Sequence, residues 1–261
     1  MSDTRKILDN LLSGEISIEE AEKRIRTLAL DRVGSIAQID VDRGNRSGIP
    51  EVVFADSKDI VDIIDIVKGM LEKTEVVLVT RMTSEKLVSL KENMSRYQIE
   101  VMGRHPILSV LISTGNWISS KKEGRIAIVT AGTSDIPYAN ESEALARLMG
   151  VDVISFYDVG VSGIHRLIEP LKEIIAKDVD AVIVFAGMEG ALPTVIAALI
   201  DIPVIGVPVP TGYGYGGKGE TALASMLQSC SPGLAVVNIG NGLGAASVAT
   251  LIAKRAVRMN K

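Results

Sequence analysis

Two side chains in the C-terminal half have the chemistry of a nucleophile and of a general acid or base. Cys230, the only cysteine, stands between a predicted helix and Ser231-Pro232-Gly233 rather than inside an apolar element. A thiolate there would be a good nucleophile if its pKa is lowered, although a lone cysteine is more often an inert core residue. Glu189 directly follows an apolar strand, where desolvation would poise it as an acid or base, or where it would cap a helix N-terminus.

The predicted strands of the second half all end in small or polar residues. These ends are residues 131–135, 158–166, 186–193, 207–220 and 238–246. Ligands of open parallel sheets bind outside the carboxyl ends of the strands, so five such ends predict one pocket rim. Asn238 and Asn241 fall at the last end, and Gly187 lies two residues before Glu189. Asp135 has the same two interpretations as Glu189, and His165-Arg166 is either an anion clamp or an ordinary helix start.

Two further segments are candidates for binding an anion. Arg43 and Arg46 lie in a polar, turn-rich stretch just before the predicted strand Val52–Phe54. Their guanidinium groups would bind a carboxylate or phosphate, unless the stretch is simply a solvated loop. The run from Gly212 to Lys218 nearly matches a P-loop, but Gly219 stands where the metal-binding hydroxyl belongs. We interpret it as a phosphate-approach loop or lid, with plain flexibility as the alternative.

The elements that position these residues alternate between strand and helix. The second half predicts strands at 126–130, 151–157, 181–185, 204–207 and 234–237, each followed by a helix, which indicates a parallel sheet covered on both faces. The first half predicts two short helices within 1–30, a strand within 35–42 and then βαβ alternation up to 113. The fold class is therefore α/β: a C-terminal three-layer, Rossmann-like domain (121–261) preceded by a smaller α/β N-terminal domain (1–120).

Composition excludes several classes of function. The chain has 261 residues, 47% of them hydrophobic, and a net charge of −4 with scattered basic residues. It therefore predicts a small-molecule partner rather than nucleic acid or a membrane. One cysteine and no basic-apolar N-terminal segment predict a cytoplasmic protein. Too few His and Cys are present for a structural zinc site, whereas carboxylates or substrate phosphates would suffice for Mg²⁺.

Six ordered motifs covering nearly the whole chain resemble the LarB family of nickel-pincer cofactor biosynthesis proteins. They are RSGIPEVVFA, TAGTSDIP, DVGVSGIHRL, AGMEGALP, GVPV and SCSPGLAVVNIGNGLGAA. The C-terminal half is also similar to aminoimidazole ribonucleotide carboxylase, including Ser134-Asp135 and His165-Arg166. That family has a histidine where this chain has Ala191, and this departure, with the added N-terminal domain, favours the first resemblance.

The LarB resemblance implies carboxylation of the pyridinium ring of nicotinic acid adenine dinucleotide at C5 by CO₂ or bicarbonate. Hydrolysis of the phosphoanhydride would then release AMP and a pyridinium-3,5-biscarboxylic acid mononucleotide. In this scheme Cys230 is the covalent nucleophile and Glu189 the acid/base or CO₂-orienting group. The remaining assignments concern substrate binding. The similarity to the carboxylases implies that Gly132, Thr133, Ser134 and Asp135 hold ribose or phosphate. Arg43 and Arg46 are our candidates for binding the substrate carboxylate or the diphosphate.

We also expect a metal ion and an oligomeric state, and two alternative functions stay open. A diphosphate substrate leads us to expect Mg²⁺, with ligands that the sequence does not identify. The resemblance to carboxylases leads us to expect a homo-oligomer formed through the C-terminal domain. The alternatives are a carboxylase or mutase acting on aminoimidazole ribonucleotide, and a non-catalytic nucleotide-binding sensor.

Overall fold

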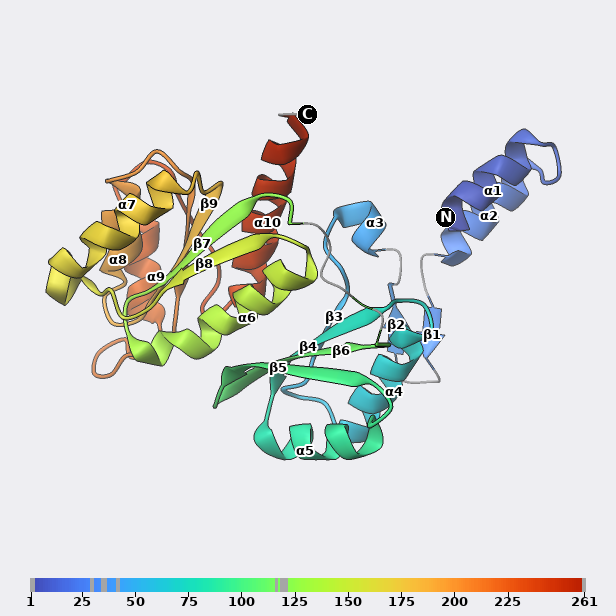
Figure 1. Cartoon of the computed structure of the whole chain (residues 1–261), viewed down its shortest axis with the longest axis horizontal. Coiled ribbons are helices and arrows are strands. Elements are labelled where there is room, and N and C mark those ends of the chain that lie inside the picture. Colours follow the sequence, from blue (N-terminus) through green and yellow to red (C-terminus); the bar gives the residue numbers. More distant parts are fainter. Residues whose placement is uncertain are drawn as a thin grey trace.

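A computed structural model of the chain describes residues 3–28, 31–33, 37–40, 43–115, 117 and 122–259. Its strands form a five-stranded sheet in the C-terminal half and a four-stranded sheet in the N-terminal half (Figure 1). The domain boundary expected at 120/121 lies outside the described residues.

The C-terminal sheet is parallel throughout, as the sequence predicts. It contains β7 (Arg125–Thr130), β8 (Asp152–Phe156), β9 (Ala181–Ala186), β10 (Val204–Pro208) and β11 (Leu234–Val236), in the order β11-β10-β9-β7-β8. The six residues of β9 are all buried. A continuous apolar run of this kind is expected where helices cover both faces of a sheet.

Alternate strand residues enter two different cores. Ile126 and Ile128 face α6 (Ile136–Leu148) and α10 (Gly242–Met259), while Ala127 and Val129 face the opposite core. The opposite core is formed with three helices. They are α7 (Ile168–Ala176), α8 (Ala191–Ala197) and α9 (Glu220–Leu227). The period of two along β7 therefore produces the three-layer arrangement.

The N-terminal sheet is mixed, which corrects the expectation of simple βαβ alternation. Its strands are β3 (Val52–Phe54), β4 (Val76–Met82), β5 (Gln98–Arg104) and β6 (Ile107–Ser113), in the order β3-β4-β6-β5. Only β3 and β4 pair in parallel, and β6 is antiparallel to both of its neighbours. The short connection between β5 and β6 forces a hairpin, which the apolar pattern of β6 does not reveal. The helices α4 (Ile60–Leu71) and α5 (Ser84–Asn93) complete this part.

The first forty residues contain paired elements. The helices α1 (Asp3–Leu12) and α2 (Ile18–Leu28) confirm the two predicted helices, and the Ser17 hydroxyl accepts a hydrogen bond from the Glu20 amide at 3.2 Å. The strand β2 (Ala37–Ile39) lies within the expected strand 35–42, and it pairs antiparallel with β1 (Asp31–Val33), which was not predicted. Residues 35, 36, 41 and 42 of the expected strand lie outside the description.

Helix α6 joins the two sheets because it packs against both. It contacts β7 and β8 on one side and β4, β5 and β6 on the other. Leu78 of β4 and Leu111 of β6 belong to the same core as Leu145 of α6 and Phe185 of β9. A helix that is buried around most of its circumference is expected between two layers rather than at a surface.

Truncation of a side chain between the layers tests this shared packing. Leu145 is 1% exposed, so Leu145→Ala should lower the free energy of unfolding by about 2–5 kcal/mol through lost burial and the cavity left behind. Urea unfolding followed by circular dichroism measures the change. A loss below about 0.5 kcal/mol would contradict close packing at this position.

Candidate functional site

The candidate site lies at the carboxyl edge of the parallel sheet, where the strand order reverses. The chain leaves β7 for β8 on one side and later returns to β9 on the other, so β7 and β9 flank the switch point. Ligands of open α/β sheets bind in the crevice that such a reversal leaves. The loops after β7, β9 and β10 meet at this edge through Asp135, Gly187 and Thr211.

Asp135 is the buried acid of the crevice. It ends the 3₁₀ turn η1 (Thr133–Asp135) and directly precedes α6, whose first turn contains Pro137. Its Oδ2 accepts the Gly132 amide at 2.9 Å, and its Oδ1 accepts the Thr211 hydroxyl at 2.7 Å. Burial raises the pKa of the Asp135 carboxyl, and these two hydrogen bonds oppose the rise. A buried carboxyl held by neutral donors in a crevice is typical of a functional group.

The residues next to Asp135 complete the floor and wall of the crevice. Gly187, which follows β9, lies so close to Thr211 that a Cβ atom at this glycine would be 2.5 Å from the Thr211 hydroxyl. A side chain at Gly187 would therefore displace the Thr211 to Asp135 bond. Thr133 and Ser134 are exposed, so their hydroxyls remain accessible to a ligand. The structure thus brings together Gly132 to Asp135 and Gly187, as the sequence predicts.

His165 and Arg166 lie at the neighbouring strand end. They belong to η2 (Val161–Leu167), which follows β8. His165 is exposed, and Arg166 donates from Nη1 to the Asp158 carbonyl at 2.7 Å and to the Asp158 carboxylate at 3.1 Å. Arg166 is therefore oriented by Asp158, and an arriving anion would have to share the guanidinium with that carboxylate.

The loop after β11 reaches the same edge. Gly240 donates its amide to the Pro208 carbonyl at 2.8 Å and adopts a φ of 66°, which favours glycine. Asn241 precedes α10 and accepts the Gly244 amide at 2.8 Å, so it caps that helix. Asn238 is exposed, and its side chain accepts the amide of Ile239 at 2.9 Å. Both predicted asparagines lie at the carboxyl edge and support the backbone of the loop.

The environment of the Glu189 side chain differs from the one expected. It follows β9 at the carboxyl edge, as predicted, but its side chain is exposed. The expectation that burial desolvates this carboxylate is therefore wrong. The apolar run ends at Ala186, and the following loop turns outward through Met188 (φ 48°) and Gly190 (φ 64°).

Cys230 lies at the other end of its strand. It is exposed and precedes β11, near the start of β10, where the Val204 amide bonds to the Gly233 carbonyl. Its neighbours Ser229 and Ser231 bond to Thr194 of α8. A five-residue strand such as β10 is about 16 Å long, so one chain does not bring Cys230 to the carboxyl edge. The expectation that Cys230 and Glu189 share adjacent strand ends is therefore wrong within one chain.

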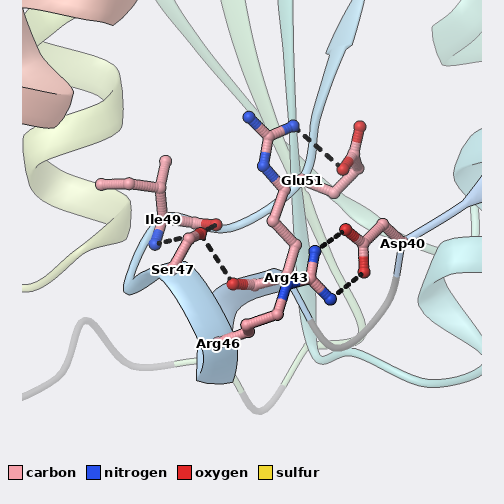
Figure 2. A network of polar contacts seen from close by, with 6 residues as sticks. All are labelled: Asp40, Arg43, Arg46, Ser47, Ile49 and Glu51. Carbon is pink, nitrogen blue, oxygen red and sulfur yellow. Dashed lines mark hydrogen bonds and ion pairs between the residues drawn. The ribbon is translucent and has the colours of Figure 1, made fainter. Parts of the chain in front are cut away.

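Arg43 and Arg46 lie on a short helix, α3 (Arg43–Ser47), rather than in the expected loop. Arg43 pairs with Glu51 at 3.2 Å and Arg46 pairs with Asp40 (Figure 2). A Cβ atom at the adjacent Gly48 would be 2.9 Å from Leu251 of α10, about 14 Å along that helix from its start at the carboxyl edge. The two arginines therefore bind nearby carboxylates, and the structure does not bring them to the crevice.

Two features of the described residues concern metal ions and membranes. No group of three or more His, Cys, Asp and Glu side chains is arranged to hold a metal ion among them. In the described ranges, no helix has the length and apolar character needed to cross a membrane.

Sequence reasoning missed four residues at or beside the crevice: Thr211, Tyr138, Arg81 and Glu141. Burial raises the pKa of Tyr138, which lies one turn after Asp135 and whose ring approaches Gly240. Arg81, on β4, bonds to Glu141 of α6 and to the Gly240 carbonyl. Glu141, a charged residue on the inner face of α6, could have indicated a buried polar contact. Its partner Arg81 lies sixty residues away in the sequence, so no local pattern identifies the pair.

Comparisons with known proteins agree with this architecture. Residues 30–109 match the family model described as the LarB/PurE-like N-terminal domain, and residues 125–261 match the AIR carboxylase model. A Methanocaldococcus jannaschii protein, described as uncharacterized, is 46% identical over 96% of both chains. The N5-carboxyaminoimidazole ribonucleotide mutases of M. jannaschii and Saccharolobus solfataricus are 33% and 27% identical over 44% and 50% of this chain, and over 68% and 79% of their own. A solved structure of Treponema denticola PurE2 aligns with a TM-score of 0.42 and 20% identity over 53% of this chain and 82% of its own.

The fold defines an α/β protein whose candidate site lies at the carboxyl edge of a parallel sheet. The chain belongs to the AIR carboxylase family and has a LarB/PurE-like N-terminal domain. Its function is accordingly of the carboxylase or mutase type.

The raised pKa of Asp135 predicts a pH-dependent stability difference. Because the folded state favours the protonated carboxyl, its contribution to stability is full at low pH and is lost as pH rises through the raised pKa. Asp135→Asn cannot titrate, so the melting-temperature advantage of the wild type over this variant should shrink as the pH rises above the ordinary carboxyl pKa of about 4. Calorimetry at several pH values measures the difference. An advantage that grows with pH would contradict burial as the dominant influence.

Proposed function

We propose that the protein carboxylates the pyridinium ring of nicotinic acid adenine dinucleotide at C5 and hydrolyses its phosphoanhydride. The products would be AMP and pyridinium-3,5-biscarboxylic acid mononucleotide. The observation that carries the proposal is the pairing of a LarB/PurE-like N-terminal domain with an AIR carboxylase domain in one chain. The mutases named above match about half of the chain, whereas the M. jannaschii protein matches almost all of it.

The crevice supports the proposal through its polar groups. Thr133 and Ser134 offer exposed hydroxyls to a ribose or phosphate at the switch point. Asp135 is held by the Gly132 amide and the Thr211 hydroxyl, so its position is fixed before a ligand arrives. His165 and Arg166, at the neighbouring strand end, would contact the anionic part of the dinucleotide.

The ring chemistry requires a nucleophile, because a pyridinium ring is electron-poor and does not attack CO₂. In the proposed route the Cys230 thiolate forms a C–S bond at C4, and the ring electrons move onto nitrogen. C5 of the resulting dihydropyridine then forms a C–C bond to CO₂, which takes up the electron pair as a carboxylate. A base removes the C5 proton, the C–S bond breaks and the aromatic ring returns. Glu189, exposed at the carboxyl edge, is the proposed base.

This route includes a second copy of the chain. Cys230 is exposed at the amino edge of its own sheet, so the proposed route requires that it contact a ligand at the carboxyl edge of another copy. The homo-oligomer expected through the C-terminal domain is therefore part of the proposal. Mg²⁺, if the reaction uses it, would accompany the diphosphate, and no step above depends on it.

Mass spectrometry of a reaction mixture tests the function. The protein is incubated with nicotinic acid adenine dinucleotide, bicarbonate and Mg²⁺. We expect AMP and a mononucleotide about 44 Da heavier than nicotinic acid mononucleotide, the mass of one added CO₂. Intact dinucleotide under these conditions, together with turnover of N5-carboxyaminoimidazole ribonucleotide, would replace the proposal with the mutase function.

Cys230→Ser tests the covalent route separately from binding. The hydroxyl is nearly isosteric but a far weaker nucleophile, so carboxylation should fall by at least about a thousandfold while dinucleotide affinity is retained. Single-turnover assays and calorimetric binding measure the two effects. Ser229→Ala, next to it in sequence, is the matched control. Wild-type turnover in Cys230→Ser would remove Cys230 from the mechanism.

A further inference from the structure

We propose that Arg81, a residue of the N-terminal sheet, is a positioning residue of the candidate site. It holds the loop of residues 238–242 through the Gly240 carbonyl, and buried Glu141 orients its guanidinium group. The inference goes beyond the proposed function because it assigns a role in the site to the N-terminal domain. Only its kinetic consequence rests on the proposed substrate.

The contacts of Arg81 connect three parts of the chain. Its Nη2 donates to the Gly240 carbonyl at 2.7 Å, and its Nε donates to Glu141 Oε1 at 3.2 Å. The guanidinium carbon also lies 5.8 Å from the centre of the Phe54 ring on β3. Gly240 is thereby fixed on both sides, since its amide already bonds to Pro208 at the end of β10. The loop that follows β11 is thus tied to the N-terminal sheet as well as to its own.

The backbone of β4 is distorted at this position. Arg81 has a φ of 56°, which is costly for a residue with a Cβ atom, and the register between β4 and β6 shifts between Val79 and Met82. Irregularities of this kind redirect a side chain out of its regular alternation. Here the redirected side chain is the one that leaves its own sheet and reaches the crevice loop.

The Glu141 side chain is fully buried, although removing a carboxylate from water costs free energy. Its Oε1 accepts the Thr80 hydroxyl at 2.7 Å as well as Arg81, while Oε2 has no hydrogen-bond partner among the described residues. A Cβ atom at Gly242 would be 3.1 Å from Oε2, so the carboxylate lies directly against the crevice loop. Glu141 is fully buried whereas the Arg81 side chain is 31% exposed, so the carboxylate is the fixed partner of the pair. The pair therefore orients Arg81 on the loop.

Hydrogen exchange tests the contact without reference to any substrate. In Arg81→Gln the Gly240 carbonyl loses a charge-assisted hydrogen bond, so amides in residues 238–244 should exchange about tenfold faster or more. Exchange in α7, in the layer on the opposite face of the sheet, should stay unchanged. Arg96→Gln removes an exposed arginine of the same domain and is the matched control. Unchanged exchange in 238–244 would overturn the inference.

A second variant tests the same contact in case Arg81→Gln does not fold. Thr80→Val removes only the hydroxyl that donates to Glu141, and it should raise exchange in the same segment by a smaller factor. No increase there would equally overturn the inference.

Kinetics tests the positioning role once turnover of the dinucleotide has been observed in the wild type. Arg81→Gln should raise KM at least about fivefold with kcat within about twofold, because the loop is displaced and the reacting groups are retained. Arg81→Lys should recover less than half of the lost affinity, since an ammonium group does not reproduce the guanidinium geometry. A fall in kcat alone, matched to loss of folded protein, would contradict positioning. If the wild type does not consume the dinucleotide, the proposed function fails while the exchange experiment still decides the role of Arg81.

Discussion

The packing of helix α6 between two sheets is the constraint on which the rest of the structure depends. Asp135 at its start is buried in the crevice, Glu141 at its middle faces the N-terminal sheet, and Leu145 joins the common core. Because the helix is buried around most of its circumference, its rotation and position along its axis are fixed. The geometry of the site therefore depends on contacts made in both halves of the chain.

This arrangement gives a physical role to the N-terminal domain. A parallel α/β sheet already provides a ligand crevice at its switch point, and Asp135, Thr211 and Gly187 form it without help from the first half. The N-terminal sheet adds Arg81, which crosses to the loop after β11. The N-terminal domain is thus in direct contact with the loop that follows β11.

Much of the fold follows from local sequence patterns. The apolar runs of β7, β9 and β10 and the small residues after them predict the parallel sheet and its carboxyl-edge crevice. The mixed N-terminal sheet was missed because the βαβ alternation was extended over β5 and β6, although the two residues between these strands are too few for a parallel crossover. Glu189 and Cys230 were placed by their position in sequence alone, and their exposure depends on how the loops leave the sheet. The Arg81 to Gly240 contact spans 159 residues and has no local signature.

A competition experiment tests the proposed action on a pyridinium dinucleotide. The protein receives equal concentrations of nicotinic acid adenine dinucleotide and aminoimidazole ribonucleotide with ¹³C-bicarbonate, and the label is located by NMR. We expect ¹³C in a second carboxylate of the pyridinium mononucleotide, with release of AMP. Label found in the imidazole nucleotide, with the dinucleotide intact, would contradict it.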